Sequence, residues 1–166
     1  GNSWLVVATM FFIMCSAQNL FVTFGAWLED EFQFGAARLA VAGFSLGLVE
    51  LVASVSSARQ TDKWGKERSI ALGALLVIPG GIFLSLGSEN LIIGLIGVFI
   101  YFLGFEFSVV SLLPLATKLV PNSPGTGLGW VLGAGTLGRA VMAIVATNLF
   151  ESFGVRGPAL MGAFFG

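Results

Sequence analysis

Long apolar runs separated by short polar stretches make up most of the chain. A helix rises 1.5 Å per residue, so roughly 20 apolar residues cross the hydrocarbon core of a bilayer. The predicted spans are residues 4–28, 36–57, 70–87, 91–115, 126–150 and 158–166, and we expect the last to be truncated. The pattern predicts an all-α polytopic membrane protein with a single transmembrane domain over residues 1–166.

The most polar stretch, residues 62–68, carries five charges in seven residues, although only 10% of the chain is charged. An ion at the bilayer centre costs about 3 kcal/mol or more, so this stretch is predicted to be a water-exposed connection between two helices. Counted from the start, the even loops carry Arg59, Lys63, Lys66, Arg68 and Lys118. The odd loops carry Arg38 and Arg156 beside Glu29, Asp30, Glu31, Glu89 and Glu151. Loops rich in Lys and Arg usually lie on the cytoplasmic side of a membrane, so the even loops are expected to be cytoplasmic. The N-terminus lies on the same side as the even loops and is therefore expected to face the cytoplasm.

Composition narrows the function classes. The chain is 56% hydrophobic and only 10% charged, whereas soluble domains carry about 25% charged residues, so we do not expect a water-soluble fold. It has no histidine and one cysteine, which leaves no basis for a zinc or copper site. Residues 133–138 match the dinucleotide pattern G-x-G-x-x-G, but they lie in an apolar helical run without the required strand. We therefore expect no metal, no cofactor, no nucleic-acid partner and no enzymatic activity.

A weak internal repeat is also present. Leu46-Gly47 in the second span and Leu137-Gly138 in the fifth align at one offset, which places the first span over the fourth. The six spans would then form two inverted three-helix repeats, a common construction in secondary transporters.

The charged stretch and its context resemble the major facilitator superfamily, whose loop signature reads approximately G-x-L-a-D-r-x-G-r-r. Residues 58–68 align with it. The matching positions are Asp62, Lys63, Gly65, Lys66 and Arg68, and the departures are Ala58, Gln60 and Glu67. The resemblance implies that Asp62, Gly65 and Arg68 belong to a cytoplasmic gating loop that latches one conformation.

Residues 24–30, 102–107 and 136–140 are similar to the second half of bacterial efflux-type permeases of this family. Together with the degenerate loop signature, they favour helices seven to twelve of a twelve-helix fold. The resemblance implies a secondary active transporter half in the bacterial inner membrane, which moves a small organic solute, by proton-coupled efflux, through alternating access.

Glu50 is a candidate proton carrier. Gly43, Gly47, Glu50, Ser54 and Ser57 recur at three- and four-residue spacing, so one face of the second span is small and polar. Such a face should point into protein or a water-filled path. The acid either carries protons or pins this helix to its neighbour.

Glu106 in the fourth span and Arg139 in the fifth are candidates for a second polar group. Opposite charges in membrane segments usually pair. The pair either binds an anionic substrate and exchanges protons with it, or joins two helices as a static ion pair. Gln18, Asn19 and Ser54 are further substrate-path candidates, and interhelical hydrogen bonding is the alternative for them.

Six helices leave a surface uncovered. The expected partners are the lipid bilayer, the solute, and a missing six-helix half, a second copy or other membrane subunits. A facilitator-like scaffold subunit that transports nothing is the competing interpretation.

Overall fold

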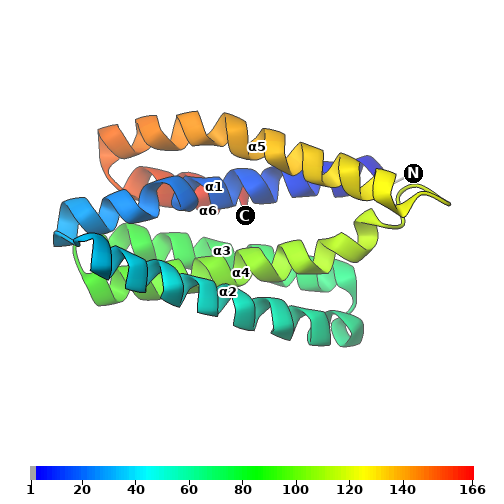
Figure 1. The fold of residues 1–166 in the computed structure, drawn as a ribbon, viewed down its shortest axis with the longest axis horizontal. Coiled ribbons are helices and arrows are strands. Elements are labelled where there is room, and N and C mark those ends of the chain that lie inside the picture. The colour runs from blue at the N-terminus through cyan, green and yellow to red at the C-terminus, as the bar shows by residue number, and fades with distance from the viewer. Residues whose placement is uncertain (1–2) are drawn as a thin grey trace.

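The computed structural model describes residues 3–166, so residues 1 and 2 of the predicted domain lie outside it. It contains six helices: α1 (Ser3–Phe32), α2 (Ala36–Trp64), α3 (Lys66–Leu86), α4 (Leu91–Ala116), α5 (Pro124–Phe153) and α6 (Arg156–Phe165) (Figure 1). The first five are long and apolar enough to cross a membrane, and α6 has 10 residues. The all-α prediction is confirmed, and each predicted span coincides with one helix.

Several helices extend beyond the predicted spans. α1 continues to Phe32, so the acidic residues 29–31 form its last turn, and the prediction that they close the span as a turn outside the helix was wrong. The chain reverses immediately afterwards, where Gln33 adopts a positive φ of 53°. Acidic side chains in water leave the backbone hydrogen bonds of a helix intact, so the helix ends later than the apolar run.

The charged stretch is helical except for one residue. α2 runs to Trp64 and α3 begins at Lys66, so the predicted seven-residue connection is reduced to Gly65. Gly65 has φ +88°, a conformation that residues with a Cβ rarely adopt, and its N–H donates to Thr61 O at 3.0 Å. The charged side chains are mostly exposed, as the sequence predicted.

The prolines in the interiors of α3 and α4 do not interrupt these helices. Pro79 lies inside α3 and Pro114 inside α4, and both helices continue through them. The turn between these helices ends in Asn90, whose Oδ1 accepts hydrogen bonds from the N–H groups of Ile92 and Ile93. This cap satisfies two backbone donors at the start of α4.

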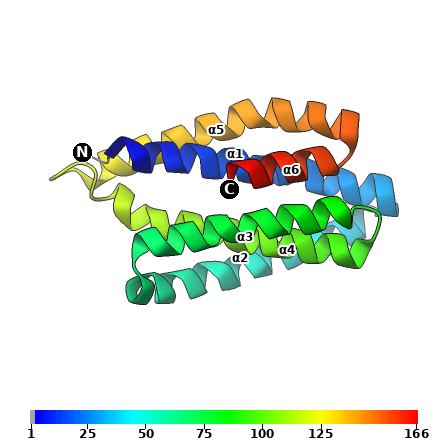
Figure 2. The ribbon, with the colours of Figure 1, turned by 180° about the vertical axis from the view of Figure 1, so that it is seen from behind.

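The helices form two layers. α5, α1, α4 and α2 follow one another across one face, because α5 packs on α1, α1 on α4 and α4 on α2. α3 and α6 pack on each other behind this row, as the view from the opposite side shows (Figure 2). We call the exposed side of the first row the open face; α5 and α2 form its two edges.

The two ends of the bundle differ in charge. One end holds the start of α1, the α2–α3 connection and the α4–α5 loop, and we call it the basic end. The other holds the α1–α2, α3–α4 and α5–α6 connections, and we call it the acidic end (Figure 1). Arg156 and Glu89 form an ion pair of 2.7 Å between two connections of the acidic end.

The closest helix packing joins α3 to α4. A Cβ on Gly80 would lie 2.5 Å from Tyr101 N, and one on Gly104 would lie 2.5 Å from Gly73 O. Only glycine permits backbones to approach this closely, as in other membrane helix pairs. The core itself comes mainly from α1 and α4, including the fully buried Trp27 and Tyr101.

Candidate functional site

A row of polar and aromatic side chains crosses the open face at the middle of the helices. It begins on α5, passes over α1 and α4, and ends on α2. Direct contacts join α5 to α1 and α4 to α2 along this row, and between α1 and α4 the contact is made by Phe21 on Phe105, which precedes Glu106. We call it the mid-depth row, and its members are Arg139, Gln18, Phe21, Glu106, Ser54 and Glu50.

Arg139 begins the row at the midpoint of α5. Its Nε donates to Gln18 Oε1 at 2.8 Å, and its guanidinium lies over the Phe21 ring, 5.5 Å from the centroid. Both partners are on α1, and neither carries a charge. The side chain stays exposed, so its positive charge remains available to a second ligand or partner.

Phe21 separates the two charged ends of the row. Its ring packs edge-on against Phe102 at 4.7 Å and Phe105 at 5.8 Å between centroids, both on α4. The predicted pair of Glu106 and Arg139 is therefore not formed, and that prediction was wrong. Within residues 3–166, the one ion pair is the Arg156–Glu89 contact at the acidic end.

Glu106 is bound from the other side, by α2. Ser54 Oγ donates to Glu106 Oε1. Glu50 lies one turn before Ser54 on α2. Glu50 Oε1 is buried and has no hydrogen-bond partner in the described part of the chain. Two carboxyl groups and one hydroxyl are thus concentrated at one edge of the face.

Asn19 is not part of the row. It is fully buried, and its Nδ2 donates to Cys15 O at 2.9 Å within its own helix. Its Oδ1 is buried and has no partner among residues 3–166. Of the two neighbouring amides predicted to line a substrate path, the structure thus places Gln18 on the open face and Asn19 inside the bundle.

Two hydroxyl clusters were missed by sequence reasoning. Tyr101 OH donates to Ser16 O at 2.8 Å, and Ser16 Oγ donates to Gly162 O at 2.8 Å, so α1, α4 and α6 meet at one point. On the other side of α4, Ser111 Oγ lies 3.0 Å from Ser57 Oγ and 2.7 Å from Thr61 Oγ1. The periodic placement of Ser57 and Thr61 on α2 was the available signal for the second cluster, whereas nothing marked the first.

The gating-loop candidates lie at the basic end and project into solvent. Asp62, Lys63, Gly65 and Arg68 are exposed and Lys66 is partly so. Their side chains form no ion pair within residues 3–166.

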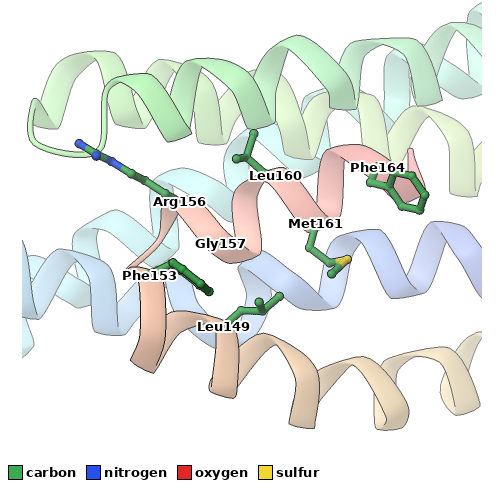
Figure 3. A pocket seen from close by; sticks show the side chains of 7 residues that line it. All are labelled: Leu149, Phe153, Arg156, Gly157, Leu160, Met161 and Phe164. Atoms are coloured by element: carbon green, nitrogen blue, oxygen red, sulfur yellow. The ribbon is translucent and has the colours of Figure 1, made fainter.

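A separate groove runs between α5 and α6. It has a volume of about 690 Å³ and is lined by Leu149, Phe153, Arg156, Gly157, Leu160, Met161 and Phe164 (Figure 3). Its single charged side chain, Arg156, extends toward the α3–α4 turn, where it binds Ser88 and Glu89 (Figure 3). The groove is therefore apolar and distinct from the mid-depth row.

No set of three or more His, Cys, Asp or Glu side chains in residues 3–166 is arranged to hold a metal ion. Comparisons of the chain with protein-family models, with curated proteins and with solved structures found no match.

Proposed function

We propose that the chain is one half of a secondary active transporter of the major facilitator type, placed in the bacterial inner membrane with its N-terminus and basic end in the cytoplasm. It moves a small organic solute by alternating access, in the direction of efflux, coupled to protons. The observation that carries this proposal is the mid-depth row, which places two partly buried acids and one exposed arginine at the middle of an apolar bundle. Charges at that depth are costly unless they line a path or meet a partner.

The pairing of the helices supports a duplicated construction. If α1 is exchanged with α4, α2 with α5 and α3 with α6, every packed pair becomes a packed pair, and α1–α4 and α3–α6 become themselves. α1–α5 becomes α4–α2, α3–α4 becomes α6–α1, and α2–α3 becomes α5–α6. This is the pattern expected of two inverted three-helix repeats, and therefore of half of a facilitator fold.

In this proposal the two ends of the row have different roles. Glu50 and Glu106 take up a proton from one side of the membrane and release it to the other. Arg139 binds the anionic group of the solute, because its guanidinium offers N–H donors beyond the one held by Gln18. Ser54 orients Glu106, and Gln18 orients Arg139.

The second candidate is a scaffold subunit that transports nothing. It is favoured by the contacts that Arg139 and Glu106 already make, because Gln18, Phe21 and Ser54 hold both side chains in fixed places. In this case the row would serve only to dock another membrane protein.

Proton movement separates the two candidates. The protein would be purified from its native membrane in mild detergent with whatever remains bound, and reconstituted with a pH-sensitive dye inside the vesicles. We expect a panel of small organic anions and cations to produce proton flux, and Glu50→Gln, Glu106→Gln and Arg139→Gln each to lower it at least ten-fold. Glu151→Gln, which alters an exposed acid at the acidic end, is the matched control. Unchanged flux in all three variants would contradict the proposal, and absence of flux in the parent protein would favour the scaffold.

A further inference from the structure

A second groove lies at the acidic end, between the beginning of α2 and the first half of α4 (Figure 1). It has a volume of about 410 Å³. Val41 and Ala42 of α2 and Leu95 and Phe99 of α4 form its apolar wall, and Arg38 is the single charged residue of its lining. The groove thus combines an apolar wall along two helices with one cation near the end of the bundle.

Arg38 is the cation of the acidic end that has no counter-charge. The other basic side chain at this end, Arg156, pairs with Glu89 at 2.7 Å. Arg38 forms no ion pair within residues 3–166, although the acidic residues 29–31 precede it in the sequence. Its side chain is exposed, and the guanidinium lies over the Phe34 ring, 5.9 Å from the centroid. Phe34 therefore holds the guanidinium beside the groove without supplying an acceptor for its N–H groups.

The position of Arg38 along α2 matches the depth of lipid phosphates. Glu50 lies at the midpoint of the 29-residue helix, and Arg38 precedes it by twelve residues, or about 18 Å at 1.5 Å per residue. The hydrocarbon core extends about 15 Å from the bilayer centre, so a midpoint at that centre puts Arg38 just outside the hydrocarbon. Ala42 lies about 12 Å from the same centre, which is within the hydrocarbon. The cation is thus at the level of the headgroups and the apolar wall at the level of the acyl chains.

We propose that this groove binds a phospholipid of the surrounding membrane, with one acyl chain between α2 and α4 and the phosphate diester on the Arg38 guanidinium. The phosphate is the anion that a bilayer supplies at this depth. A guanidinium binds phosphate through two parallel N–H···O bonds, which fixes the headgroup in orientation as well as in position. The acyl chain then lies along the groove in van der Waals contact with its apolar wall.

A phospholipid fits this groove better than the other candidate occupants do. A helix of another protein would have to bring an acid to the position of Arg38, whereas every phospholipid carries a phosphate at that depth. A small water-soluble anion would bind the guanidinium and leave the apolar wall uncovered. Lipid binding requires only that the bundle lies in a bilayer, so failure of this site would leave the proposed function standing.

The first test counts the lipid molecules that the full chain retains. The protein is purified in detergent, stripped of lipid and titrated with phosphatidylcholine, and bound lipid is counted by native mass spectrometry. We expect one tightly held molecule. Diacylglycerol with the same acyl chains has no phosphate and should bind about ten-fold more weakly or worse. Arg38→Gln should weaken phosphatidylcholine to the same level and leave diacylglycerol unchanged. Arg156→Gln, which removes the paired cation of the same end, is the matched control and should change neither lipid. Equal binding of the two lipids, or an Arg38→Gln variant that binds phosphatidylcholine as the parent does, would overturn the site.

The second test locates the acyl chain. Phosphatidylcholine with a photoreactive diazirine in one acyl chain is incorporated into the vesicles that hold the protein, and labelled peptides are identified by mass spectrometry. We expect residues 41–45 and 95–99 to be labelled in excess over the other lipid-facing segments. Ala42→Trp, which fills the groove, should remove that excess, whereas Leu160→Trp, which fills the groove between α5 and α6, should leave it unchanged. Uniform labelling of all helices would mean only general contact with lipid and would refute a specific site. Protection of both segments by a second copy or another membrane protein would refute it as well.

Discussion

Substitution of Gly80 by alanine tests the close packing of α3 on α4, on which the placement of the open face depends. A Cβ on Gly80 would lie 2.5 Å from the backbone N of Tyr101, 2.7 Å from its Cα and 2.9 Å from Gly97 O. All three are backbone atoms of α4, so no side-chain rotation can relieve the contact. The helices must separate, and the buried Tyr101 must move with α4.

The magnitude follows from two opposing effects. Alanine is favoured over glycine inside a helix by about 1 kcal/mol. Overpacking of a tight core costs about 1–3 kcal/mol, and contact with three backbone atoms of α4 puts Gly80→Ala at the upper end of that range. The expected result is a net loss of about 1–2 kcal/mol in the free energy of unfolding. Gly25→Ala is the matched control, because a Cβ there would meet nothing within 4 Å. It should leave stability unchanged or raise it by up to about 1 kcal/mol.

Unfolding can be followed in mixed micelles by titration with sodium dodecyl sulfate, with tryptophan fluorescence as the signal, since Trp27 is buried in the core. The informative quantity is the difference between the two variants, because the helix propensity term is common to both. A Gly80→Ala protein as stable as Gly25→Ala would refute the backbone-to-backbone packing of α3 on α4.

Three other contacts give predictions for the same titration. Tyr101→Phe should lower the free energy of unfolding by about 1 kcal/mol because it removes a buried hydrogen bond. Gly162→Ala should cost less in that background than in the parent protein, since its Cβ would meet the Tyr101 hydroxyl. Trp27→Phe should lose about 1 kcal/mol or more, because Trp27 Nε1 donates to Ser88 O at 2.9 Å. Glu89→Gln should change stability by less than about 1 kcal/mol, since the ion pair with Arg156 is exposed; a larger loss would contradict this.

Much of the fold could be predicted from the apolar runs, because hydrocarbon requires every backbone group in a span to bond within its own helix. The number of helices and their centres follow from that requirement. The positions of the helix ends do not follow from it, because backbone groups in water can form hydrogen bonds with solvent as well as within a helix. Residues 29–32 and 58–64 are polar and yet helical, so α1 and α2 extend beyond the region that hydropathy marks.

For the candidate site, the position of each charged residue along its helix could be predicted, but the neighbouring helix that the residue would face could not. Glu50, Glu106 and Arg139 were recognised because each charge interrupts an apolar run. The hydroxyls of Ser16 and Tyr101 were missed because they interrupt nothing, and their cluster forms only when α1, α4 and α6 converge. Spacing along a chain does not indicate which neighbour a helix face will meet.

The error over Glu106 and Arg139 has a physical cause that bears on the function. Two opposite charges on helices of one bundle attract only if no larger side chain occupies the gap between them. Here the Phe21 ring lies under the Arg139 guanidinium and packs on Phe102 and Phe105. Moving it aside would give up aromatic packing worth about 0.5–1.5 kcal/mol per ring pair. Because this packing keeps the acid and the base apart inside one chain, neither charge neutralises the other.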